Sequence, residues 1–194
     1  GFTEALAKLI GQNHPKADGG QAVTTTAGRR HHSPCLNDFG AGVGQYGRAL
    51  LSQLGAGLCY RGYDGGGDVE AFTGGFVQYF DLTMPLALPR AEWVMSLEVG
   101  EHIPSAHEAT VIRNLHAHAC RGIILSWATL NQSGIGHVNN HAPDYLATIF
   151  EGLGYWRNTA YEQALRKAPR TNVVAPWLRR STIVWERHRR ISPC

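Results

Sequence analysis

Short apolar segments alternate with amphipathic segments along most of this chain, and this alternation restricts its fold more than any other feature. Five apolar segments have the length of strands, at 35–39, 58–63, 76–80, 93–97 and 122–128. Apolar residues recur at helical spacing after the first segment, after Pro104 and after Pro143. Strands that alternate with helices form a mostly parallel sheet with helices on both faces. We therefore predict a doubly wound α/β fold.

The two ends of the chain are expected to complete this domain. Residues 2–10 have helical spacing and are predicted to cover an edge of the sheet, and the polar residues 11–34 are typical of a loop. Alternation over 181–187 predicts a last, antiparallel strand. The prediction is a single domain, with an N-terminal helix and loop or lid at 1–33 and the α/β unit at 34–194.

Two helix starts have the spacing of a capping box, in which a hydroxyl residue is followed three positions later by Glu. Ser105 and Glu108 form one such pair, and Thr159 and Glu162 form the other. In each pair we expect the hydroxyl to cap the helix and the carboxylate to bond back to the cap residue.

Composition and cysteine content set broad limits on the class of protein. Apolar residues make up 43% and charged residues 17% of the chain, which argues against disorder, and the net charge of +3 permits a nucleic-acid partner without requiring one. Cys35 and Cys120 lie in or beside apolar segments and are expected to be buried thiols, so a reducing, cytoplasmic location is the default. No apolar run is long enough to span a bilayer, and because Gly1 is not Met we expect further sequence before it.

A glycine-rich loop follows the first predicted strand and precedes a helix. It reads Asp38-Phe39-Gly40-Ala41-Gly42-Val43-Gly44. The glycines permit a tight turn and a close approach of a ligand to the backbone. Residues 42–47 also fit the Gly-x-Gly-x-x-Gly pattern that binds the pyrophosphate of a dinucleotide. A carboxylate ahead of the glycines suits instead a ligand with an ammonium group.

The loop resembles the signature loop of class I S-adenosylmethionine (SAM)-dependent methyltransferases, and the resemblance extends over about residues 34–156. It implies that Asp38 and the glycines Gly40, Gly42 and Gly44 hold the amino-acid part of SAM. It also implies that Asp64, at the end of the second strand, accepts from the ribose hydroxyls. In the same way, Asp81 would accept from the adenine amino group, and Leu82 would pack on the ring.

The turn after the fourth strand, Glu98-Val99-Gly100-Glu101-His102, gathers two carboxylates and an imidazole. It is similar to the turn of ubiquinone-pathway O-methyltransferases and of small-RNA 2′-O-methyltransferases. This resemblance implies a divalent cation such as magnesium on Glu98, Glu101 and His102, with His137 completing the site. A metal-free site, in which the same residues orient the substrate or act as a base, is the alternative, and Glu98 is also expected to contact the cofactor.

These features together predict a SAM-dependent methyltransferase that acts on a small-molecule acceptor, and the Glu98 turn favours a hydroxyl oxygen as the acceptor atom. Trp127, Asn131 and Gln132 follow the fifth strand and are candidates for the acceptor pocket. An RNA or protein acceptor is the nearest alternative. A NAD-dependent oxidoreductase and a non-catalytic SAM-binding module are the alternatives of another class. No membrane partner is expected, and the pattern does not define an oligomeric state.

Overall fold

A seven-stranded sheet organises the chain in the computed structural model, which describes residues 1–11, 33–168, 178–191 and 194. The strands are β1 Cys35–Phe39, β2 Cys59–Asp64, β3 Val77–Tyr79, β4 Ala91–Leu97, β5 Ala119–Ser126, β6 Tyr155–Arg157 and β7 Ile183–Arg187. The helices are α1 Phe2–Gly11, α2 Gln45–Leu54, α3 Val69–Thr73, α4 Glu108–His118, α5 Pro143–Gly152, α6 Thr159–Lys167 and α7 Leu178–Ser181. Three short 3₁₀ helices cover Gly55–Gly57, Gly100–His102 and Ser105–His107. The predicted loop or lid lies outside the described residues.

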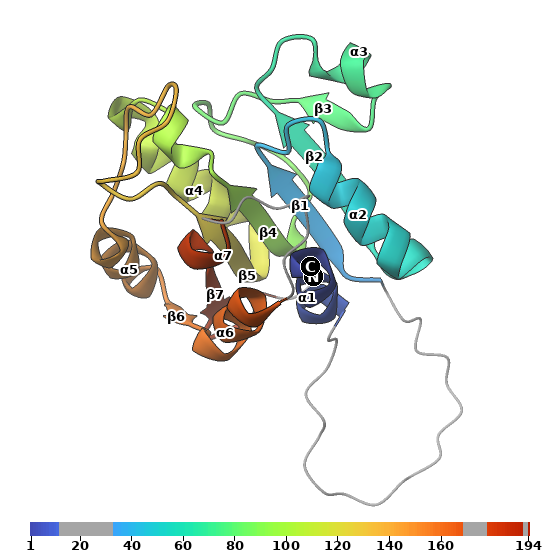
Figure 1. The fold of residues 1–194 in the computed structure, drawn as a ribbon. Helices are drawn as coiled ribbons and strands as arrows, with labels where there is room; N and C mark the ends of the chain where they lie inside the picture. Colours follow the sequence, from blue (N-terminus) through green and yellow to red (C-terminus); the bar gives the residue numbers. More distant parts are fainter. Residues whose placement is uncertain (12–32, 169–177, 192–193) are drawn as a thin grey trace, which may run out of the picture.

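The strand order is β3-β2-β1-β4-β5-β7-β6 (Figure 1). The five strands β1 to β5 pair in parallel, whereas β7 runs antiparallel to both β5 and β6. This arrangement confirms the predicted doubly wound, mostly parallel sheet with an antiparallel last strand. It also places the turns that follow β1, β2, β4 and β5 at one edge, where such sheets bind ligands.

Alternate residues of the central strands enter two separate cores, one on each face of the sheet. Leu36, Met95 and Ile124 pack with side chains of α1, α2 and α6. Phe39 and Ile123 pack on the other face with side chains of α4 and α5. The period of two along each strand therefore explains why both faces are covered by helices.

No helix among the described residues is long and apolar enough to cross a membrane.

The N-terminal helix α1 forms as predicted, but it lies across the middle of one face of the sheet, and the prediction that it covers an edge is wrong. Phe2, Leu6 and Ile10 are fully buried in the core that contains Leu36. Figure 1 shows α1 beside α6 and the lower end of α2. A helix with this large an apolar stripe is more stable against the centre of a face than at a half-exposed edge.

Two other sequence predictions differ from the structure in their details. The fifth strand begins at Ala119 and not at residue 122, because the polar Arg121 is 7% exposed and pairs with Glu186 at 3.0 Å. Neither predicted capping box forms. Residues 105–107 make a 3₁₀ turn before α4, and α6 is capped by the Asn158 side chain, which accepts from the Tyr161 N–H at 3.2 Å.

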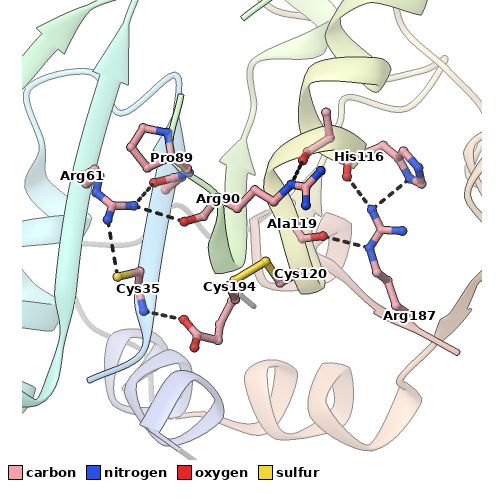
Figure 2. The surroundings of a disulfide bond; sticks show 12 residues. Cys35, Arg61, Pro89, Arg90, His116, Ala119, Cys120, Arg187 and Cys194 are labelled. Carbon is pink, nitrogen blue, oxygen red and sulfur yellow. Dashed lines mark hydrogen bonds between the residues drawn. A yellow bond between two sulfur atoms is a disulfide. The ribbon is translucent and has the colours of Figure 1, made fainter. Parts of the chain in front are cut away.

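A disulfide joins Cys120, at the start of β5, to the C-terminal Cys194 (Figure 2). The expectation that Cys120 is a buried thiol is therefore wrong, whereas Cys35 and Cys59 are free and half-buried. Beside the disulfide, Arg187 donates to the Ala119 carbonyl at 2.8 Å. Disulfides are uncommon in reducing compartments, so the cysteines no longer support a cytoplasmic default.

Candidate functional site

The glycine loop connects β1 to α2 at the carboxyl edge of the sheet. Gly40 and Gly44 have φ values of 79° and 77°, which side chains rarely adopt. A Cβ atom on Gly40 would also lie 2.2 Å from Val99, and one on Gly44 would lie 2.6 Å from Phe76. Backbone conformation and packing therefore both require glycine at these two positions.

The protein itself uses several N–H groups of this loop. The N–H groups of Gly40 and Ala41 both donate to the Tyr63 carbonyl, at 2.8 and 3.0 Å. The N–H of Gly42 donates to the Asp64 carboxylate at 2.7 Å. A pyrophosphate at such a loop is held by free N–H groups, and these three are already engaged.

Asp64 ends β2 and lies beside the glycine loop. Its second carboxylate oxygen accepts from the Gly66 N–H at 2.9 Å, so the side chain links the loop after β1 to the turn after β2. The residue is partly exposed. A carboxylate in this place has further lone pairs for hydroxyl donors.

Asp38, near the end of β1, is 2% exposed and lies beneath the same loop. Its carboxylate accepts from the Tyr60 hydroxyl at 2.8 Å. Burial raises the pKa of Asp38 to about 7, against the opposing effect of the Tyr60 hydrogen bond, and the charge of Asp64 adds to the rise. Tyr60 is absent from the sequence prediction, and no sequence pattern indicates its role.

Asp81 and Leu82 follow β3 but occupy different surroundings. The Asp81 carboxylate is exposed and accepts from the N–H and the hydroxyl of Thr83, at 2.8 and 2.7 Å, and these bonds lower its pKa. Leu82 is 6% exposed and packs in the core with Phe39 and Val94. The roles of both residues toward an adenine ring stay predictions.

Glu98 is the first residue after β4 and has a positive φ of 56°. Its N–H donates to the Ser126 hydroxyl at 2.8 Å. Its carboxylate accepts from the Gln132 amide at 2.7 Å and from the Ser181 hydroxyl at 3.1 Å. A non-glycine residue in this conformation is strained, and such strain persists where surrounding contacts impose it, often at functional sites.

Three of the four predicted metal ligands come together. One ligand atom from each of Glu101, His102 and His137 lies within 4.8 Å of the others. The rings of His102 and His137 are 4.9 Å apart and perpendicular. Glu98 lies outside this group, because its carboxylate is bonded to Gln132 and Ser181.

Glu101 is fully buried, and neither of its carboxylate oxygens has a hydrogen-bond partner in the described structure. Burial raises the pKa of Glu101 to about 7, and the charge of Glu98 adds to the rise, while the nearby backbone N–H groups of Glu101 and Ala128 and the His137 imidazole oppose it. The His137 Nδ1 lies 3.1 Å from the Gln132 carbonyl, so this nitrogen carries the proton and Nε2 is left as an acceptor. A buried carboxylate without donors needs a cation or a proton.

The loop that carries His137 is attached to the Glu101 turn. The N–H groups of Val138 and Asn139 both donate to the Glu101 carbonyl, at 2.8 and 3.1 Å. The Asn139 carbonyl accepts from the indole of Trp127 at 2.6 Å. Trp127 is therefore a buried support of this loop, and it does not line the cavity beside Glu98.

A cavity of about 700 Å³ opens between the start of α2, the end of β4 and the loop after β5. Its walls include Gln45, Tyr46, Leu97, Glu98, His102, Asn131, Gln132, Ser133, Gly134, His137 and Leu178. The predicted acceptor residues Asn131 and Gln132 thus face the same space as Glu98, His102 and His137. A cavity of this volume accommodates a small organic molecule.

Many solved structures share this architecture. Magnesium protoporphyrin IX methyltransferase from Synechocystis, with bound SAM, matches 80% of this chain and 70% of its own at a TM-score of 0.56 and 18% identity. An amino pentose methyltransferase from Micromonospora echinaspora, also with SAM, matches 81% and 85% at a TM-score of 0.58 and 13% identity. An O-methyltransferase family protein from Burkholderia thailandensis matches 97% and 57% at a TM-score of 0.58 and 13% identity.

The chain has the fold of class I SAM-dependent methyltransferases. This confirms the resemblance inferred from the glycine loop at the level of the fold. No protein-family model matches the sequence, and no curated protein matches it significantly. Within this methyltransferase fold, the predicted site residues lie along one edge, from Asp81 through Asp64 and the glycine loop to Glu98 and His137.

Proposed function

We propose that this chain is a SAM-dependent methyltransferase that acts on a small-molecule acceptor. One observation carries the proposal. The glycine loop lies beside two carboxylates, Asp38 and Asp64, and the N–H groups of Gly40, Ala41 and Gly42 already donate hydrogen bonds within the protein. The two carboxylates repel the negative charge of a pyrophosphate, and the engaged N–H groups cannot bind it. The same carboxylates suit a ligand with an ammonium group and ribose hydroxyls. The NAD-dependent alternative is therefore disfavoured. Solved structures with this fold contain SAM or S-adenosylhomocysteine.

In this proposal each carboxylate along the edge binds one part of the cofactor. Asp38 attracts the ammonium of the amino-acid part, beneath Gly40, Gly42 and Gly44. Asp64 accepts from the ribose hydroxyls, and Asp81 accepts from the adenine amino group. The cavity lined by Glu98, His102 and His137 then receives the acceptor. Holding both reactants in line is the largest contribution that such an enzyme makes to methyl transfer.

A divalent cation fits the cluster of Glu101, His102 and His137, and because two of these three ligands are imidazoles, a first-row transition-metal ion suits it better than magnesium. The two buried, unpartnered oxygens of Glu101 need a positive charge, and imidazole nitrogens complete a set of ligands. When bound there, the cation would lower the pKa of an acceptor hydroxyl. Without it, the imidazole of His102 or His137 would take the hydroxyl proton. Either route favours an oxygen acceptor.

Binding of S-adenosylhomocysteine measured by calorimetry tests the proposal. We expect the chain to bind S-adenosylhomocysteine and not NAD⁺. Asp64→Ala should weaken binding about tenfold or more, because the ribose loses a charged acceptor. Asp68→Ala is the matched control, since Asp68 is exposed and its side chain makes no capping bond.

Three results would contradict the proposal or redirect it. Preference for NAD⁺ would favour the oxidoreductase. Equal affinities of the Asp64 and Asp68 variants would refute the ribose assignment. Binding without methyl transfer to any hydroxyl or amine acceptor, RNA and protein included, would favour a non-catalytic module.

A further inference from the structure

A second, smaller cavity of about 160 Å³ lies at the same edge of the sheet, between the ends of β5 and β6 and the helices α5 and α6. Its polar wall consists of Thr129, His141, Arg157, Arg166 and Ser181. No acidic residue is among its described lining residues. The guanidinium groups of Arg157 and Arg166 are 37% and 41% exposed, so an anion from solvent can reach them at the mouth of the cavity.

The two arginines are held from behind by one carboxylate. Arg157 donates to both oxygens of Glu162, at 2.7 and 2.8 Å, and Arg166 donates to Glu162 at 3.2 Å. Glu162 is 1% exposed. One buried carboxylate thus orients two guanidinium groups beside the cavity. The Nη1 of Arg157 donates to no acceptor in the described part of the chain.

His141 is held in a similar way by a second buried carboxylate. Its Nε2 pairs with Glu108, which also accepts from Asn139 at 2.9 Å and from the Tyr145 hydroxyl. The imidazole stacks on the Tyr145 ring at 4.2 Å. Both Glu108 and Glu162 therefore orient donors that line the cavity, instead of facing it themselves.

A hydrogen bond links the lining of this second cavity to the lining of the larger one. Ser181 lines the smaller cavity and donates to Glu98, which lines the larger cavity, at 3.1 Å. For a molecule anchored beside Arg157 and Arg166, the nearest route to the larger cavity passes Ser181. That route leads toward Glu98, His102 and His137.

We propose that the smaller cavity is a subsite for an anionic group of the acceptor, either a carboxylate or a phosphate. This assignment rests on the proposed methyltransferase function. Planar guanidinium groups that are already oriented by a carboxylate bind such anions with little loss of side-chain entropy. The acceptor is then a small organic acid or phosphate ester that also carries the methylated hydroxyl.

Titration of two simple anions, acetate and inorganic phosphate, followed by NMR in the presence of S-adenosylhomocysteine, tests the subsite. We expect one of them to bind, and Arg166→Gln to weaken that binding about tenfold or more. Arg157→Lys, which keeps the charge that Glu162 needs, should weaken it as well. Arg90→Gln is the control, because Arg90 is exposed and lies at the opposite end of β4. Whichever anion binds more tightly identifies the group on the acceptor.

The subsite is refuted if neither anion binds to the wild-type chain. It is also refuted if the Arg157 and Arg166 variants bind the anion as tightly as the Arg90 control does. Affinity for S-adenosylhomocysteine is measured in the same samples. If the wild-type chain binds the anion through the arginines but does not bind S-adenosylhomocysteine, the proposed methyltransferase function is refuted and the anion site stands. Cofactor binding without arginine-dependent anion binding would refute the subsite alone.

Discussion

Glu101 is a buried carboxyl group that needs either a cation or a proton. Neither of its oxygens has a partner in hydrogen-bond geometry, and burial raises its pKa to about 7. We expect Mn²⁺, used as a probe, to bind at this residue with His102 and His137. Glu101→Gln should weaken Mn²⁺ binding by more than about tenfold, as measured by electron paramagnetic resonance. Affinity for S-adenosylhomocysteine should change little.

Glu98→Gln is the matched variant for this prediction. The Glu98 carboxylate is already bonded to Gln132 and Ser181, so its loss should affect Mn²⁺ much less than the loss of Glu101. Equal losses of Mn²⁺ affinity in the Glu98 and Glu101 variants would show that Glu98 is also a ligand, as the sequence predicted. If Mn²⁺ does not bind to the wild-type chain, the proposed metal site is refuted, and Glu101 is instead accommodated by binding a proton.

Asp38 makes cofactor affinity depend on pH in a defined direction. Its pKa is raised to about 7, so it is neutral at pH 6 and ionised at pH 8. An ammonium ligand prefers the ionised form, and the affinity for S-adenosylhomocysteine should rise with pH, by up to about tenfold per unit below the pKa. Calorimetry between pH 6 and 8 measures this slope, which should be absent in Asp38→Asn.

Methylthioadenosine provides the control for Asp38, because it lacks the ammonium group. Its affinity should not follow the titration of Asp38. A pH slope shared by both ligands, or one that persists in Asp38→Asn, would show that another group titrates. The Tyr60 hydrogen bond lowers the pKa of Asp38, so Tyr60→Phe should move the profile to higher pH.

At the scale of single residues, the sequence located the acids but not their partners. Asp38 and Asp64 are recognisable because each lies at or next to the end of a strand and is followed by glycines. Tyr60 bonds to Asp38 only because β1 and β2 pair in parallel, with Asp38 opposite Gly62. That register is a property of the assembled sheet, and no local pattern around Tyr60 reveals it.

At the scale of elements, the start of α6 gives a direct test of local stability. Asn158 is buried, caps the helix and also donates to Glu186 at 2.8 Å, whereas Thr159 is exposed. Asn158→Ala should lower the free energy of unfolding by about 1–2 kcal/mol. Thr159→Ala should change it by less than about 0.5 kcal/mol. Urea unfolding of the two variants measures both values, and a larger effect of Thr159→Ala would support the predicted capping box.

Elements with strong apolar periodicity were predictable, and elements defined by tertiary contacts were not. β1 matches its prediction residue for residue, since its apolar residues end abruptly at Gly40. β6 has only three residues and pairs with β7, so it has too little sequence to show a period. Ser181 was predicted to begin the last strand, but it is the last residue of α7, and β7 begins at Ile183. The capping boxes do not form because Glu108 bonds to the Asn139 amide and Glu162 bonds to Arg157, and neither bonds back to the residue that was predicted to cap its helix.

At the scale of the whole molecule, the order of strands and helices was sufficient to predict the class of fold. The parallel sheet follows from connections that are too long for hairpins, and the position of the site follows from the sheet. The disulfide between Cys120 and Cys194 could not be predicted in the same way. Its cysteines are 74 residues apart, and only the packing of the C-terminus against β5 brings them together.

A crystal structure of the chain with S-adenosylhomocysteine tests the central claim most directly. The account predicts that the ribose hydroxyls lie within hydrogen-bond distance of the Asp64 carboxylate, with the amino group directed to Asp38. The sulfur should face the cavity lined by Glu98, His102 and His137. A nucleoside bound elsewhere, or side chains filling the edge above the glycine loop, would contradict it.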